Sequence, residues 1–172
     1  HQGVSAARNI GVAASSGEWL AFLDSDDRWL PHKLATQVAF CTAHPTTDIC
    51  QTEETWFRNG VRVNPRQVHR KPSGDIFIAS LNLCLVSPSA VMLRRTLFHR
   101  VGGFDTGLPA CEDYDLWLRI TRDTPVALIP DACVVKYGGH ADQLSRQHWG
   151  MDRFRVAAIL RVLAEGELPP AY

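Results

Sequence analysis

The sequence predicts an α/β fold, in which helices alternate with buried strands. Small and apolar residues recur at helical spacing between Gly3 and Ser16, which predicts a helix that packs closely on a sheet. Residues 19–23 (WLAFL) form a short apolar run without polar alternation, as expected of a strand with neighbours on both sides and helices on both faces. Three acids follow directly, and in open α/β sheets the carboxyl ends of the strands are where ligands bind.

The later elements follow in order, separated by Gly, Pro and Asn residues. Pro31 suits the first turn of a helix, for which we expect an apolar stripe of Leu34, Val38 and Cys41. An Asn-Gly pair supplies the positive φ angles of a tight hairpin turn. We predict strands at 48–52, 90–93, 126–129 and 133–137, a hairpin at 56–63, an irregular basic loop at 64–75, and helices at 31–44, 76–83, 95–101, 112–120 and 150–165.

The composition is that of one globular domain. With 172 residues and 45% hydrophobic content, the chain has enough material for a core. The formal net charge is +0, which argues against nucleic acid or an acidic membrane as a partner bound through bulk charge. No apolar run approaches the ~20 residues that a membrane span needs. The five cysteines lie far apart without a CxxC pair, which argues against zinc and disulfides and favours a reducing cytosol.

Asp24, Asp26 and Asp27 lie at the end of the first predicted strand. Carboxylates on one loop repel one another unless a cation neutralises them, and hard oxygen ligands suit Mg²⁺ or Mn²⁺. The alternative is an acidic turn before a helix, whose N-terminus favours negative charge. In that case Asp27 would cap the helix that begins near Pro31.

A second acidic pair, Glu112 and Asp113, stands at the predicted start of a helix. A helix N-terminus stabilises carboxylate charge by roughly 0.3–1 kcal/mol when exposed. An acid that stays ionised there suits a base that accepts a proton from a hydroxyl. Ordinary complementarity to the helix dipole is the alternative explanation, and the pair alone leaves both open.

Both clusters belong to longer stretches that resemble the family 2 glycosyltransferases of the GT-A fold. Residues 3–11 (GVSAARNIG) and 17–27 (GEWLAFLDSDD) resemble the central block of that family, and residues 112–119 (EDYDLWLR) resemble its second acidic motif. The order, the spacing and the intervening GFD at 103–105 also fit, and the resemblance covers most of the chain. It implies a GT-A type mixed sheet flanked by helices.

The resemblance implies a task for each acid. Asp24 and Asp26 match the D-x-D pair that holds Mn²⁺ or Mg²⁺ against the diphosphate of a nucleotide-sugar donor, with Asp26 the better candidate for direct contact. Asp113 matches the base that deprotonates the hydroxyl of a glycan, lipid-linked or protein acceptor. Glu112 would support Asp113 or orient the acceptor. The implied reaction is a metal-assisted, inverting sugar transfer.

Three further residues have two interpretations each. Arg8 would reach the phosphate or nucleotide of the donor, or else make a structural salt bridge. His140 would be an additional metal ligand, or else a histidine of a surface turn. Trp117 would line the acceptor pocket, although its helical spacing favours packing in the core.

We expect residues 1–172 to be a single, partial GT-A domain. The family's first strands and its pocket for the nucleotide base would precede His1, and the strand edge they normally cover would favour pairing with another copy. The implied location is the cytoplasm, including the inner face of the membrane. Two other functions stay open: a metal-dependent phosphatase with Asp24 as nucleophile, and a non-catalytic sugar-binding module derived from a transferase.

Overall fold

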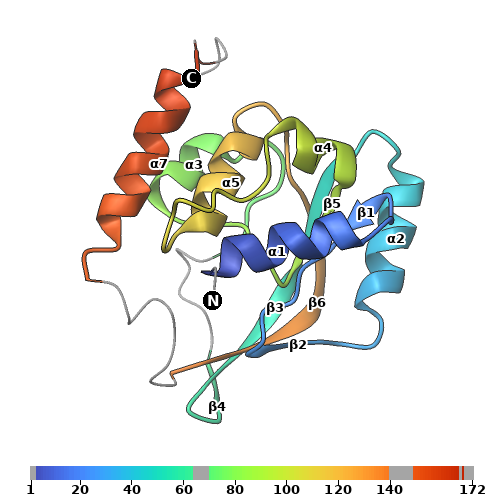
Figure 1. Ribbon diagram of the computed structural model, residues 1–172. Coiled ribbons are helices and arrows are strands. Elements are labelled where there is room, and N and C mark those ends of the chain that lie inside the picture. Colours follow the sequence, from blue (N-terminus) through green and yellow to red (C-terminus); the bar gives the residue numbers. More distant parts are fainter. Residues whose placement is uncertain (1–2, 64–69, 140–148, 167, 169–172) are drawn as a thin grey trace.

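A mixed sheet of six strands lies between helices in the computed structural model of the chain, which describes residues 3–63, 70–139, 149–166 and 168 (Figure 1). The strands are ordered β1 (Trp19–Leu20), β5 (Val91–Arg94), β3 (Ile49–Arg58), β6 (Ala127–Gly138) and β2 (Asp27–Trp29), with β4 (Val61–Val63) paired to β3. The helices are α1 (Gly3–Ala14), α2 (Lys33–Ala43), α3 (Phe77–Asn82), α4 (Arg95–Arg100), α5 (Glu112–Thr121) and α7 (Asp152–Ala164).

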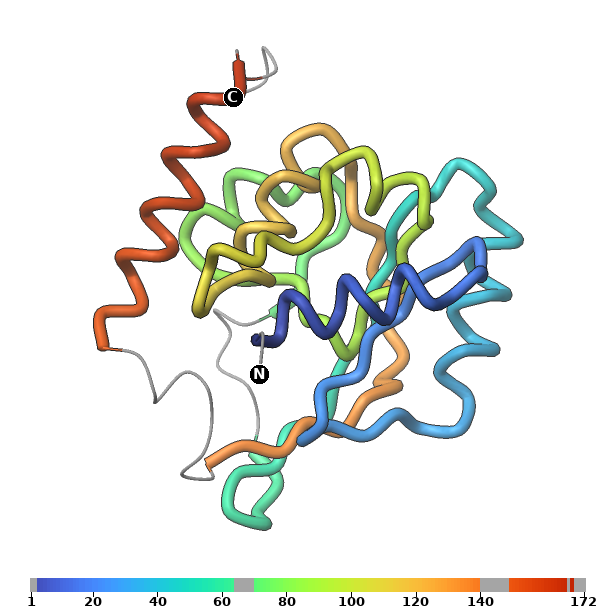
Figure 2. Tube along the Cα trace, viewed as in Figure 1, coloured from blue at the N-terminus to red at the C-terminus, as the bar shows by residue number. Residues whose placement is uncertain are grey.

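The long strands β3 and β6 form the centre of the sheet and run parallel, side by side (Figure 2). The sequence predicts two separate strands where β6 is continuous, and this prediction is wrong. The register with β3 shifts between Thr52 and Glu53, where it passes over Pro130 and Asp131 of β6. A proline cannot donate to the ladder and is tolerated at such an irregularity. Pairing therefore continues on both sides of the interruption.

Alternate residues of β3 build two separate cores, because successive strand side chains point to opposite faces. Ile49 packs with side chains of α1, α4 and α5 on one face of the sheet, whereas Cys50 packs with Cys41 of α2 on the other. The predicted hairpin is confirmed, with φ angles of 50° at Asn59 and 78° at Gly60 in the turn between β3 and β4.

The strand predicted at 19–23 is shorter and less enclosed than expected. Among the described residues, β1 pairs only with β5 and lies at the end of the strand order. Phe22 is still buried, against Phe98 and Phe104, but Leu23 is 48% exposed. Leu20 and Phe22 lie in the core on one face of the sheet, and Trp19 and Ala21 pack, partly buried, against the core on the other face.

The stripe predicted for α2 is also wrong at two of its three positions. Leu34 and Val38 are 45% and 48% exposed, whereas Lys33 and Gln37 are fully buried. Lys33 Nζ donates a 2.5 Å hydrogen bond to Gln37 Oε1 and lies 4.3 Å from the centre of the Trp29 ring. The two polar side chains satisfy each other, which permits their burial. Burial lowers the pKa of Lys33 to about 8.

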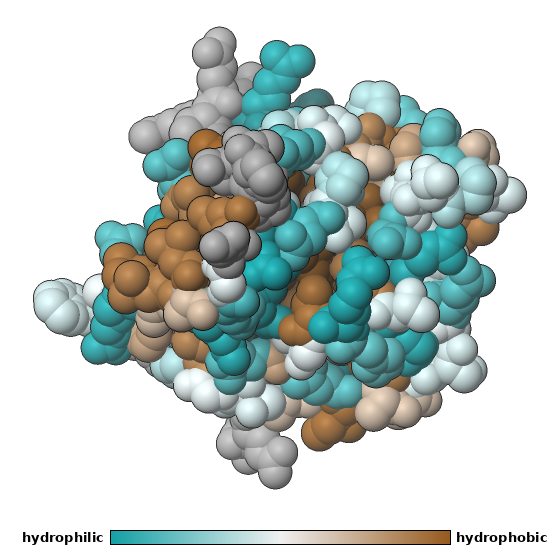
Figure 3. All heavy atoms as spheres, turned by 90° about the horizontal axis from the view of Figure 1, so that it is seen from above, coloured by the Kyte–Doolittle hydropathy of each residue, from teal (hydrophilic) through white to brown (hydrophobic). Residues whose placement is uncertain are grey.

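The predicted C-terminal helix is confirmed as α7, which packs outside α3 and α5 (Figure 1). Ala158 and Val162 are buried in that contact. On the outer face, Val156, Leu160 and Leu163 are at least 50% exposed, and an apolar patch is visible on this side of the molecule (Figure 3). No helix in the described ranges is both long enough and apolar enough to span a bilayer.

Candidate active site

Arg8 of α1 joins the two acidic clusters that the sequence singles out. Its guanidinium donates hydrogen bonds to Asp24 Oδ1 at 2.5 Å and to Glu112 Oε1 at 2.7 Å. Burial by itself would lower the pKa of Arg8, but the two carboxylates outweigh it and raise the pKa. Arg8 therefore makes the structural salt bridge that was one of its two predicted roles. This salt bridge holds the loop after β1 against the start of α5. Contact of Arg8 with donor phosphate stays a prediction.

The first cluster, Asp24, Asp26 and Asp27, lies where the chain runs from β1 into β2. One oxygen of each carboxylate lies within 4.8 Å of the others, and Asp26 is exposed. These are hard oxygen donors of the kind that Mg²⁺ and Mn²⁺ prefer. The cluster therefore has the chemistry that the predicted cation requires.

Asp27 anchors this cluster and does not cap the next helix, which begins only at Lys33. Its Oδ2 accepts a 2.6 Å hydrogen bond from Ser89 Oγ and lies 3.3 Å from Lys136 Nζ. The same Ser89 hydroxyl accepts a hydrogen bond from the Asp24 backbone N–H at 3.1 Å. Burial raises the pKa of Asp27. Among the described residues its buried Oδ1 has no hydrogen-bond partner, so one oxygen remains that a cation would satisfy.

The second cluster occupies the first turn of α5, where Glu112, Asp113 and Asp115 have different partners. Glu112 is bound by Arg8, and burial raises its pKa. Asp115, with a side chain 1% exposed, accepts a 2.6 Å hydrogen bond from Arg119 one turn further along the helix. These ion pairs hold the helix start in place around Asp113.

Asp113 differs from its neighbours because no described cation pairs with it directly. Its Oδ1 accepts a 2.7 Å hydrogen bond from the Tyr114 backbone N–H, and its Oδ2 lies 3.8 Å from Cys84 Sγ. Burial raises the pKa of Asp113, and the charge of Asp24 adds to the increase. A carboxylate with raised proton affinity is a better base near neutral pH. Burial thus outweighs the stabilisation of charge expected at a helix N-terminus, and the part of Asp113 as general base stays a prediction.

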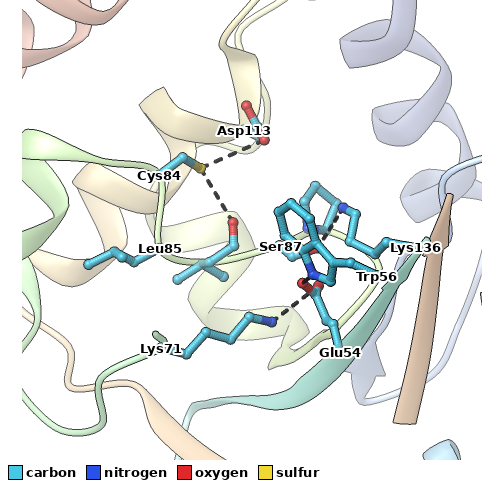
Figure 4. Close-up of a pocket in the computed structure, with 10 residues that line it drawn as sticks. Glu54, Trp56, Lys71, Cys84, Leu85, Ser87, Asp113 and Lys136 are labelled. Atoms are coloured by element: carbon cyan, nitrogen blue, oxygen red, sulfur yellow. Dashed lines mark hydrogen bonds and ion pairs between the residues drawn. The ribbon is translucent and has the colours of Figure 1, made fainter. Parts of the chain in front are cut away.

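A cavity of about 200 Å³ lies beside Asp113, with Trp56 and Lys136 across from it (Figure 4). Its lining consists of Glu54, Trp56, Lys71, Cys84, Leu85, Val86, Ser87, Pro88, Asp113 and Lys136. Sequence reasoning missed most of these residues. The available signal was the acidic pair Glu53 and Glu54, which lies between the strand predicted at 48–52 and the hairpin predicted at 56–63. Charged residues that continue a central strand are rarely buried unless they are paired.

Two of the remaining predictions have different outcomes. Trp117 is 2% exposed and packs in the core beside Phe104, so core packing is confirmed for it. His140 lies outside the described residues, and its part in metal binding stays a prediction.

Solved structures with the same architecture are GT-A glycosyltransferases. The structure of S. aureus TarS 1-349 in complex with UDP-GlcNAc matches with a TM-score of 0.73 and 19% identity, covering 99% of this chain and 49% of that chain. The mannosyltransferase PcManGT from Pyrobaculum calidifontis, in complex with GDP-Man and Mn²⁺, matches with a TM-score of 0.62 and 19% identity over 99% of this chain and 46% of its own. The protein therefore has the GT-A fold, as predicted.

The sequence comparisons narrow this class to one family. The model of glycosyl transferase family 2 matches residues 1–102. WfgD of Escherichia coli, a UDP-Glc:alpha-D-GlcNAc-diphosphoundecaprenol beta-1,3-glucosyltransferase, is 30% identical over 131 residues, 74% of this chain and 48% of WfgD. An uncharacterized glycosyltransferase of Rickettsia felis is 27% identical over 154 residues, 84% of this chain and 25% of its own length.

The chain belongs to glycosyl transferase family 2, as its motifs indicate. Membership in this family favours neither of the two other functions considered, a metal-dependent phosphatase and a non-catalytic sugar-binding module. The chain spans 25% of the Rickettsia felis protein and 48% of WfgD, so it matches only part of each relative.

Proposed function

We propose that this chain carries the catalytic centre of an inverting glycosyltransferase that moves a sugar from a nucleotide-diphosphate donor to an acceptor hydroxyl. The observation that supports it most strongly is the Arg8 bridge, at 2.5 Å to Asp24 and 2.7 Å to Glu112. It places the acidic cluster suited to a cation beside the helix turn that holds Asp113. Donor diphosphate at the first cluster and acceptor in the cavity would then meet between them.

In this proposal Asp113 takes the proton of the acceptor hydroxyl while the oxygen attacks the anomeric carbon. The bond from that carbon to the donor diphosphate breaks in the same displacement, so the configuration inverts. Asp24 and Asp26 would hold a divalent cation, which when bound would supply positive charge to the departing diphosphate. Arg8 and Glu112 keep the two clusters at a fixed separation, and such positioning accounts for much of the catalysis in group transfer.

The substrates of similar proteins support a choice of donor and acceptor. WfgD takes UDP-Glc and a diphosphoundecaprenol-linked GlcNAc, and TarS was solved with UDP-GlcNAc. We propose a UDP-hexose donor and an acceptor sugar linked through diphosphate to a lipid. The enzyme would then act at the cytoplasmic surface of the membrane that holds this acceptor.

The direct test is transfer by the whole protein from UDP-glucose to a GlcNAc-diphospho-lipid in the presence of Mn²⁺. Proton NMR of the product reports the anomeric configuration through the coupling of the new anomeric proton. The proposal expects a β-linkage from the α-configured donor. An α-linkage would contradict inversion, and hydrolysis of generic phosphoesters without transfer would contradict the reaction type.

A further inference from the structure

One face of β3 presents an aromatic ring to the cavity beside Asp113 (Figure 4). Glu54 and Trp56 are two residues apart and therefore point to the same face of the strand. Lys136 is the register partner of Trp56 on β6 and stands next to it. Asp113 faces this group from α5, so the cavity lies between an indole and the carboxylate assigned to proton transfer.

A buried ion pair fixes the orientation of this indole. Trp56 Nε1 donates a 3.0 Å hydrogen bond to Glu54 Oε2, and Glu54 Oε1 lies 3.1 Å from Lys71 Nζ. Lys71 in turn donates a 2.9 Å hydrogen bond to the backbone oxygen of Thr52. The side chains of Glu54 and Lys71 are only 3% and 7% exposed. Burial would raise the pKa of Glu54, but Lys71 and Lys136 reverse the effect and lower it, so the carboxylate stays ionised.

Burying such a pair seldom adds stability relative to apolar residues of similar size. Its contact with Trp56 gives it another use, because the hydrogen bond from Trp56 Nε1 to Glu54 restricts the rotation of a ring that faces the cavity. A ring that is already oriented loses less entropy when a ligand stacks on it. The ion pair is therefore best explained as support for a binding surface.

We propose that Trp56 is the platform on which a hexopyranose ring of the acceptor stacks, with a hydroxyl directed toward Asp113. A pyranose has one apolar face of C–H groups, which suits a flat indole, and a rim of hydroxyls that the charged and polar groups around the cavity can bind. The cavity of about 200 Å³ is smaller than the ~300–1,000 Å³ of pockets for drug-sized ligands, and so fits a single ring. This inference rests on the proposed function and adds the residue on which the acceptor sugar binds.

The test measures binding and needs no turnover. Methyl glycosides of glucose, galactose, mannose and N-acetylglucosamine are titrated, by saturation-transfer NMR, into the whole protein with UDP and Mn²⁺ present. The variants are Trp56→Ala, which removes the platform, and Trp56→Phe, which keeps a flat ring but lacks the bond to Glu54. Phe57→Ala is the matched control, because Phe57 is the adjacent aromatic residue, points to the other face and stacks on Tyr137.

We expect at least one glycoside to bind the wild type and Phe57→Ala equally. Trp56→Ala should weaken that binding about tenfold, and Trp56→Phe by less, with UDP affinity unchanged. Binding of no glycoside, or unchanged binding to Trp56→Ala, would overturn the inference. Loss of UDP affinity in both Trp56 variants would instead mean that the indole stacks on the nucleotide base. Hydrolysis of UDP-glucose in the absence of acceptor, measured on the same samples, tests the proposed function separately.

Discussion

The two acidic clusters of the site have the same composition in outline but different surroundings. Each holds three carboxylates, one of which is bound by Arg8: Asp24 in the first cluster and Glu112 in the second. Each also has one carboxylate fixed by another cation, Asp27 by Lys136 and Asp115 by Arg119. In both clusters these ion pairs hold two of the three acids in place.

The third acid differs between the clusters. Asp26 is exposed to solvent, as a ligand of a hydrated cation and a diphosphate has to be. Asp113 lines a cavity, and burial raises its pKa, as suits a base that takes a proton. The surroundings of the two acids therefore agree with the different roles proposed for them, cation binding by Asp26 and proton transfer by Asp113, and the predictions below test these two assignments.

Removing the cation should have the largest effect. Excess EDTA or Asp26→Asn should lower transfer by about 10³-fold or more, because a catalytic metal contributes several kcal/mol and each 1.36 kcal/mol is a factor of ten. Steady-state assays with added Mn²⁺ or Mg²⁺ measure the loss and its recovery. Full activity in excess EDTA would show that transfer does not need a divalent cation.

Asp113→Asn keeps the shape of the side chain and removes its capacity to accept a proton. We expect kcat to fall by about 10²–10⁴-fold, the usual contribution of a general base. Asp123→Asn is the matched control, because Asp123 is exposed and its one ion pair among the described residues is with the adjacent Arg122. If Glu112→Gln is inactive while Asp113→Asn retains near-normal turnover, the base has been assigned to the wrong acid.

Asp115→Asn should affect stability more than chemistry. It leaves Arg119 buried without its carboxylate partner, which typically costs about 3–5 kcal/mol of unfolding free energy. Chemical denaturation with urea measures this change. An Asp115→Asn variant as stable as the wild type would show that the pair does not hold the helix start.

Asp113→Asn should have a smaller effect on stability, of opposite sign. Burial raises the pKa of Asp113, so the folded protein keeps this proton to a higher pH than the unfolded chain does. Above that range the charged carboxylate costs stability, and the variant should melt about 2–4 °C higher for each kcal/mol removed. The gain should disappear below about pH 3.9, where an ordinary aspartate is also protonated. Thermal melting of the wild type and of Asp113→Asn across this pH range, without donor, measures the difference in stability.

Much of this arrangement could be predicted from the sequence, and the failures have physical causes. The start of α5 at Glu112 and the hairpin turn at Asn59-Gly60 depend on local signals, and these predictions agree with the structure. The exposed side of α2 was predicted wrongly because apolarity alone does not show that Lys33 and Gln37 satisfy each other when buried. The fold is confirmed by its similarity to TarS.

The cavity could not have been predicted, because its residues come from elements far apart in the chain. Lys71 pairs with Glu54 of β3, and Lys136 reaches Asp27 through the pairing of β2 with β6. Spacing along a sequence carries no information on such contacts. The neighbourhood of Trp56 therefore became apparent only in the structure.

The most direct test of the separate roles proposed for Asp26 and Asp113 is a calorimetric titration of Mn²⁺ into the UDP-bound protein. It compares the wild type with Asp26→Asn and Asp113→Asn, two variants that lose one carboxylate charge each. The account predicts that Asp26→Asn weakens Mn²⁺ binding by more than about 100-fold, beyond the 10–100-fold typical of residues that only support metal ligands. Asp113→Asn should bind Mn²⁺ as the wild type does. Equal losses in the two variants would contradict the account, because they would show that both clusters serve the metal.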